Sequence, residues 1–175
     1  MSREQVSLYD PLTDQVCGVA PRDEVRARNL PHAGTAVLLT DSAGRVYVHR
    51  RTDTKDVYPG RWDCWAGGVV AAGETPADAA VRELAEELGV RDVSLEPLSQ
   101  QWYRDEHVHY LAVTFRAVYD GPVTLQADEV AEGTWMTWDE LRVLLDDPHR
   151  PFVPDGRLAI EQLMSQGLVN AGLPR

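Results

Sequence analysis

The chain has 175 residues and a formal net charge of −11, a length typical of one domain that buries a sizeable core. No apolar run approaches the roughly 20 residues that cross a membrane, and the polar N-terminus lacks the apolar core of a signal peptide. The negative charge disfavours non-specific binding of nucleic acid. Two cysteines, Cys17 and Cys64, have no metal-ligand spacing. We therefore expect a single cytoplasmic domain over residues 1–175 that binds neither nucleic acid nor a membrane.

Apolar periodicity, turn residues and helix caps predict strands that alternate with helices along the chain. The predicted strands are 6–9 and 16–19, joined as a hairpin, 34–40 and 45–50, joined as a second hairpin, and then 66–70, 93–104, 109–119 and 132–136. The predicted helices are 22–29, opened by Pro21, then 76–88, capped by Thr75 or Glu74 and ended by Gly89, then 138–145, with Thr137 and Glu140 at capping-box spacing, and 157–166. This order favours an α/β fold with a mixed sheet between helices.

The helix predicted after Pro76 carries three glutamates on one face. At about 100° per residue, Glu87 lies about 40° from Glu83, and Glu86 about 60° to the other side. Like charges at this spacing destabilise a helix, and the helix dipole disfavours anions at its C-terminal end. Carboxylate oxygens are the ligands that Mg²⁺ prefers, usually beside substrate phosphates. The alternative is a solvated acidic face, but the glycine-rich lead-in favours a metal site.

Residues 68–90 resemble the Nudix box, G-x5-E-x7-R-E-U-x-E-E-x-G-U, in which U is a bulky aliphatic residue. The nine specified positions are occupied by Gly68, Glu74, Arg82, Glu83, Leu84, Glu86, Glu87, Gly89 and Val90. The resemblance implies an α/β/α sandwich that hydrolyses a diphosphate linked to another group, with Mg²⁺ or Mn²⁺ as cofactor. It also implies that homodimers are common among relatives.

By position in the box, Glu83, Glu86 and Glu87 are the implied metal ligands and catalytic carboxylates. A backbone carbonyl of Gly67 or Gly68 is a further implied ligand, and Glu74 and Arg82 are implied to support the loop through salt bridges. The general base is one of the three glutamates or a carboxylate from a distant loop. Among distant carboxylates we prefer Glu129 over Glu106. Phosphate-binding candidates precede the box, namely Arg50, Arg51 and Lys55, because cations near the site bind phosphate oxygens.

About two-fifths of the chain, before the box, also resembles isopentenyl diphosphate isomerase and its relatives. The matching residues are 6–10, Gly18, 30–33, Arg50, Arg51, Lys55 and 58–62. This predicts that residues 1–32 are an N-terminal hairpin extension packed on the Nudix domain.

The isomerase chemistry itself is not expected. Its Cys-Gly-His motif corresponds here to Gly67-Gly68-Val69, and a metal histidine corresponds to Val25, which leaves only His32. Three functions stay open: a metal-dependent pyrophosphohydrolase, which we prefer, an isomerase of a prenyl diphosphate, and a nucleotide-binding module without catalysis.

Overall fold

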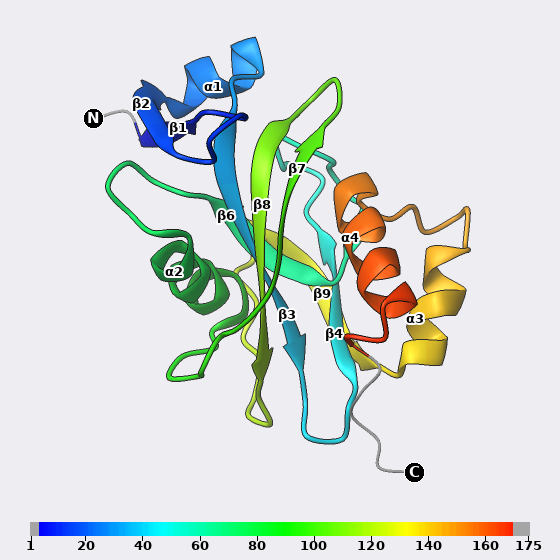
Figure 1. The fold of residues 1–175 in the computed structure, drawn as a ribbon. Helices are drawn as coiled ribbons and strands as arrows, with labels where there is room; N and C mark the ends of the chain where they lie inside the picture. The colour runs from blue at the N-terminus through cyan, green and yellow to red at the C-terminus, as the bar shows by residue number, and fades with distance from the viewer. Residues whose placement is uncertain (1–3, 170–175) are drawn as a thin grey trace.

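The computed structural model describes residues 4–169, in which nine strands form one sheet and four helices flank it (Figure 1). The strands are β1 Gln5–Tyr9, β2 Val16–Pro21, β3 His32–Thr40, β4 Val46–Arg51, β5 Trp62–Asp63, β6 Trp65–Val69, β7 Glu96–Arg104, β8 His109–Val118 and β9 Val130–Met136. The helices are α1 Arg22–Arg28, α2 Pro76–Leu88, α3 Trp138–Leu145 and α4 Pro154–Ser165. Among the described residues, no helix has the length and apolarity needed to cross a membrane.

Strand β3 lies at the centre of the sheet. It pairs antiparallel with β6 over Gly34–Leu38 and parallel with β8 along its whole length. β7 joins the far edge of β8, and β9 joins β4, both antiparallel. The sheet is therefore mixed, as the order of strands and helices predicted.

The predicted hairpin of residues 34–40 and 45–50 is only partly correct. The turn forms, but β3 and β4 pair only at Thr40 and Val46. β3 is buried on both faces, and β6 and β8 occupy its two edges beyond the turn, so β4 diverges from it. A strand of this kind belongs in the middle of a sheet rather than at the edge of a hairpin.

Alternate residues of β3 face two separate apolar layers, as the two-residue period of a strand requires. Leu38 packs in a cluster with Leu141 of α3 and Ile160 of α4. Val37 and Leu39 pack on the opposite face in a cluster with Leu84 and Leu88 of α2. Figure 1 shows α2 on one side of the sheet and α3 and α4 on the other, which confirms the α/β/α sandwich.

The helix ends mostly follow the predicted caps. Thr75 accepts a hydrogen bond from the backbone of Asp78 at the start of α2, and Gly89 ends that helix at a φ of 68°. Thr137 and Glu140 form the complete capping box of α3. Two boundaries differ: α1 ends at Arg28, with Asn29 as its left-handed cap, and α4 begins at Pro154, three residues before the expected start. A proline at the first helical position explains the longer α4, because its fixed φ suits a helix.

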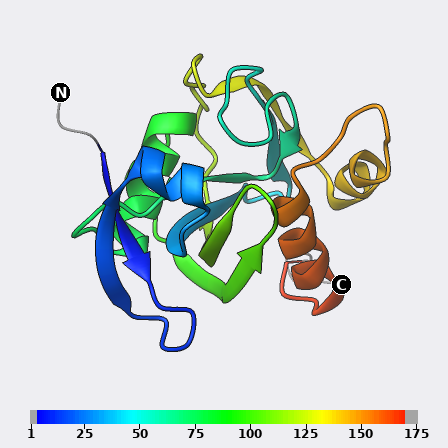
Figure 2. The ribbon, with the colours of Figure 1, turned by 90° about the horizontal axis from the view of Figure 1, so that it is seen from above.

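The N-terminal segment extends the sheet. β2 and β1 form the predicted hairpin, and β1 pairs with β3 between Leu8 and His32. Figure 2 shows this hairpin and α1 at one end of the molecule, beside α2. Val6 and Val25 pack with Val69, so the extension contacts the strand that leads into the Nudix-like loop.

Candidate active site

The acidic ridge, defined as Glu83, Glu86 and Glu87, lies on the C-terminal half of α2. The side chains of Glu83 and Glu87 are 14% and 4% exposed, whereas that of Glu86 is 51% exposed. Leu84 and Leu88 hold the adjoining face of the helix in the core. The apolar face therefore fixes the direction in which the ridge projects, as the helical period predicted.

Arg82 organises the surroundings of the ridge. Its guanidinium forms two hydrogen bonds with Glu74, at 2.9 and 3.0 Å, and one with Glu83 at 2.7 Å. It also donates to the carbonyl of Val69 at 3.3 Å and lies 3.4 Å from Glu86. These bonds connect the helix to the end of β6, which agrees with the supporting role expected for Glu74 and Arg82.

Two glycines of β6 bring the sheet close to the ridge. The backbone N–H of Gly67 donates to Glu87 at 3.1 Å. A Cβ placed on Gly68 would lie 2.3 Å from Oε1 of Glu83, so the carboxylate rests against the backbone where a side chain would be. Only glycine permits this approach. The strand and the helix thus form one surface of backbone and carboxylate groups.

Lys55 links two carboxylates that are far apart in the sequence, those of Glu87 and Glu129. The ammonium group of Lys55 lies 3.6 Å from Oε1 of Glu87 and forms a close ion pair with Glu129. Lys55 and Glu129 were predicted separately, as a phosphate-binding residue and as a general base. The structure brings both to the buried end of the acidic ridge.

Burial shifts the pKa values of this cluster toward the uncharged forms. The pKa of Glu87 is raised to about 7 by burial, which outweighs the attraction of Lys55. Burial also raises the pKa of Glu83 and lowers that of Lys55. Low-dielectric surroundings disfavour every isolated charge. A divalent cation bound to these carboxylates would stabilise their charged forms.

The other predicted residues lie at different distances from the ridge. Arg51 donates two hydrogen bonds to the carbonyl of Val57 and lines a cavity next to Gly67 and Gly68. Arg50 points elsewhere and pairs with Glu132 and Asp53. Glu106 projects from the β7–β8 loop and is largely exposed.

Cys64, the cysteine nearest in sequence to the missing isomerase thiol at Gly67, does not suit isomerase chemistry. Cys64 is fully buried in the cluster that contains α3 and α4, and burial raises its pKa well above the ordinary value. A catalytic cysteine needs a low pKa and access to its substrate. His32 also stays neutral at ordinary pH, because burial lowers its pKa to about 4.

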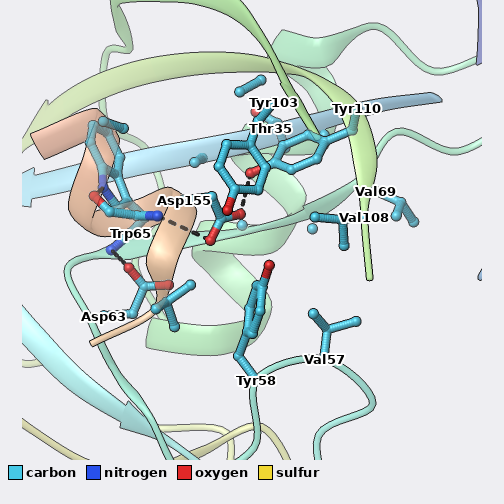
Figure 3. Close-up of a pocket in the computed structure, with 18 of the residues that line it drawn as sticks. Thr35, Val57, Tyr58, Asp63, Trp65, Val69, Tyr103, Val108, Tyr110 and Asp155 are labelled. Carbon is cyan, nitrogen blue, oxygen red and sulfur yellow. Dashed lines mark hydrogen bonds between the residues drawn. The ribbon is translucent and has the colours of Figure 1, made fainter. Parts of the chain in front are cut away.

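A cavity of about 130 Å³, which no sequence pattern indicated, lies beside the ridge (Figure 3). Its wall combines β3, β6, β7 and β8 with the 52–61 loop and the start of α4. Figure 3 shows the Tyr58 ring rising from this loop toward Tyr103, Tyr110 and Asp155. Tyr58 and Asp155 are about a hundred positions apart in the sequence, and no motif connects them.

The acidic ridge has the donor chemistry of a magnesium or manganese site. Its oxygen ligands suit hard cations, and Lys55 already places a positive charge against Glu87 and Glu129. In residues 4–169, no three histidine, cysteine, aspartate or glutamate side chains yet converge as a ready ligand set. Arg82 and Lys55 hold the carboxylates in ion pairs instead. The residues fit a divalent cation if these pairs rearrange when it binds.

An α/β/α sandwich with a glycine-rich strand feeding an acidic helix defines the Nudix class of fold. The family model of the NUDIX domain matches residues 30–156. The chain belongs to the NUDIX family and is a Nudix hydrolase.

The relatives and solved structures agree with this assignment. The Nudix hydrolase orf19 of Rhodococcus erythropolis is 45% identical over 166 residues, which cover 88% of each chain. The crystal structure of DR0079 from Deinococcus radiodurans superposes with a TM-score of 0.72, at 22% identity, over 90% of this chain and 98% of that one. The NUDIX domain of Shewanella oneidensis NrtR, solved in complex with ADP-ribose, has a TM-score of 0.62 at 19% identity and covers 90% of this chain and 93% of its own. At these identities the two structures show the fold alone.

Proposed function

We propose that the protein is a divalent-metal-dependent hydrolase that cleaves the diphosphate linkage of a nucleoside diphosphate-linked or other small organic diphosphate. The observation that carries the proposal is the acidic ridge, packed against Gly67 and Gly68 and held in place by Arg82. A ridge of this kind costs stability in the free helix, which a bound cation would recover.

The metal-binding residues in this proposal are Glu83, Glu86 and Glu87, together with the carbonyl of Gly67. Mg²⁺ or Mn²⁺ bound there would neutralise phosphate charge and lower the pKa of a bound water. Side chains of the protein would bind the phosphates and remove a proton from the attacking water. Arg51 and Lys55 would bind phosphate oxygens, and Arg50 stays a weaker candidate because Glu132 and Asp53 already pair with it.

Glu129 is the proposed general base. It belongs to the same cluster as Glu87 and Lys55, whereas Glu106 lies on an exposed loop. When Lys55 turns toward a phosphate, the carboxylate of Glu129 is released to accept a proton from the attacking water. A base must lie within hydrogen-bond reach of the proton that it removes.

The partner in this proposal is a small-molecule diphosphate rather than a nucleic acid, and the enzyme acts in the cytoplasm. A homodimer stays a prediction from the family resemblance. The first experiment is a hydrolysis screen with Mg²⁺ and Mn²⁺ over nucleoside triphosphates, nucleotide sugars and ADP-ribose, the ligand of the Shewanella NUDIX domain. Free phosphate is released for detection from the products by inorganic pyrophosphatase for the triphosphates and by alkaline phosphatase for the other compounds. Absence of release from every compound, with the protein folded, would argue for a non-catalytic binding module.

The second experiment tests the residue roles. Because Glu86 is exposed and makes one long contact with Arg82, Glu86→Gln should keep the fold and lower kcat by several orders of magnitude. Glu129→Gln should also lower kcat, while Glu106→Gln serves as the matched control with normal turnover. Near-normal turnover of Glu86→Gln at saturating Mg²⁺ would refute the metal site. A large loss in Glu106→Gln alone would move the base to that loop.

A further inference from the structure

The cavity beside the acidic ridge is positioned to receive part of the substrate. Gly67 and Gly68 belong to its wall, and the same two glycines contact Glu87 and Glu83. One strand therefore separates the carboxylates of the ridge from the cavity. Arg51, a proposed phosphate-binding residue, is also part of the wall. A diphosphate held at the ridge would therefore lie one strand away from this cavity.

The size of the cavity limits what it encloses. Its volume of about 130 Å³ is smaller than the roughly 300–1,000 Å³ of sites for drug-sized ligands. The Tyr110 ring fills the space above Gly34, where an added Cβ would lie 2.7 Å from it. The start of α4 approaches as closely, since a Cβ on Gly156 would lie 2.6 Å from Asp63. The walls are thus fixed by close packing, and the space suits a group about the size of one sugar ring.

The carboxylate of Asp155 disfavours an anionic group beside the start of α4. Asp155 lies in the first turn of α4, where a carboxylate offsets the positive end of the helix dipole. The hydroxyl of Tyr110 donates to one oxygen of Asp155, and the N–H of Gly156 donates to the other at 3.0 Å. A second phosphate or a carboxylate entering the cavity would meet this negative charge.

A cationic group is disfavoured by Arg51, which lines the cavity together with Arg26, whose charge is paired with Asp56 at 3.3 Å. His32 and Asp63 add no net negative charge near neutral pH, because burial lowers the pKa of His32 to about 4 and raises that of Asp63 to about 8. An uncharged group avoids repulsion from both Arg51 and Asp155.

Hydrogen-bonding capacity favours hydroxyls on that group. Each carboxylate oxygen accepts up to two hydrogen bonds, so Asp155 can accept more than the bonds from Tyr110 and Gly156. Aromatic rings of Tyr58, Tyr103 and Trp65 line the same space. Flat rings beside a carboxylate acceptor match the apolar faces and hydroxyl edges of a sugar.

We propose that this cavity binds the group attached to the diphosphate, that this group is an uncharged sugar, and that Asp155 selects it by accepting a hydrogen bond from a sugar hydroxyl. The inference rests on the proposed hydrolase function and deepens it. Asp155 is a specificity residue here and takes no part in the attack on phosphorus.

A matched pair of substrates tests the proposal. UDP-glucose and UDP-glucuronate differ only in a hydroxymethyl group that is a carboxylate in the second compound. With Mg²⁺, the wild-type enzyme should hydrolyse UDP-glucose with a kcat/KM at least about 10-fold higher than that for UDP-glucuronate. Asp155→Asn should raise KM for UDP-glucose about 10- to 100-fold, as loss of a hydrogen bond to a charged group predicts, with a smaller change in kcat, and it should narrow the preference between the two sugars.

Two further variants keep the test decisive. Glu161→Gln removes a carboxylate from the same helix, where it pairs with Arg157, and should leave the preference unchanged. Tyr110→Phe removes the hydroxyl bonded to Asp155 and should also raise KM for UDP-glucose. It takes the place of Asp155→Asn in the test if that variant does not fold. Binding of UDP-glucose by calorimetry in EDTA, weaker in Asp155→Asn than in the wild type, gives a readout without turnover.

The outcomes separate the two proposals. Equal kcat/KM for the two sugars, or an unchanged preference in folded Asp155→Asn, overturns the sugar site alone. Hydrolysis of nucleoside triphosphates with none of either sugar nucleotide also overturns it and leaves the hydrolase standing. No hydrolysis of any diphosphate overturns both.

Discussion

Gly68→Ala is expected to slow turnover without unfolding the protein. The new Cβ would lie 2.3 Å from Oε1 of Glu83, 2.6 Å from its Cδ and 3.0 Å from Oε2. Ordinary contact begins near 3.4 Å, so the carboxylate must retreat by roughly 1 Å. Glu83 is also bonded to Arg82 at 2.7 Å, so that bond moves or breaks. A displacement of about 1 Å at a reacting centre costs on the order of 100-fold in rate.

Gly67→Ala provides the contrast, because its neighbours are backbone atoms. A Cβ there would lie 2.0 Å from the carbonyl oxygen of Thr35 and 2.8 Å from Cα of Ala36. Those atoms belong to β3, the central strand, and Gly67 is paired with Ala36. We expect a loss on the order of 3 kcal/mol in the free energy of unfolding, as overpacking of a core produces. For Gly68→Ala the clash is with the end of a side chain, and we expect about 1 kcal/mol or less.

The assay compares the two variants in urea unfolding and in diphosphate hydrolysis at saturating Mg²⁺, measured with the coupled assay of the substrate screen. Gly68→Ala should unfold near the wild-type midpoint and turn over on the order of 100-fold more slowly. Full activity in that variant, or a loss of stability as large as that of Gly67→Ala, would show that the contact with Glu83 does not position the ridge.

Three other changes give separate tests. Asp63→Asn should flatten the pH dependence of the free energy of unfolding. Burial raises the pKa of Asp63 to about 8, so the protonated carboxyl stabilises the wild type fully below about pH 4, and this stabilisation is lost as pH rises toward 8. An equal pH profile in both proteins would contradict this. Leu84→Ala, in the core against β3, should cost about 2–5 kcal/mol in urea unfolding; a loss below about 1 kcal/mol would mean that α2 is not anchored there. Arg51→Ala should raise KM more than it lowers kcat, and an unchanged KM would reject its phosphate role.

Local sequence was sufficient for the helix that carries the ridge. Thr75, Pro76 and Gly89 determine where α2 begins and ends, and the 3.6-residue period places Glu83, Glu86 and Glu87 beside one another. These features depend on neighbours within a few positions, so they can be read without the fold. The box also identified Arg82 as a supporting residue, and its bonds to Glu74 agree with that expectation.

Contacts between distant segments depended on how the strands pair. The sequence suggested that β3 and β4 form a full hairpin, but β6 and β8 compete for the edges of β3 and leave a single pair. The pairing of β4 with β9, which places Arg51 opposite Val130, brings Lys55 to Glu129, 74 positions away, and Lys55 also reaches Glu87. Periodicity gives the face on which a side chain lies and does not say which remote strand or loop will cover it.

The cavity is the part that only the tertiary structure decided. Tyr110 and Asp155 are separated by 45 positions and belong to a strand and a helix that local pattern treats independently. They meet because α4 packs on the face of the sheet opposite α2. The sequence by itself determined an acidic helix with the composition of a metal site, since short-range geometry is encoded locally. The long-range packing of strands and helices determined which cations, bases and aromatic rings surround it.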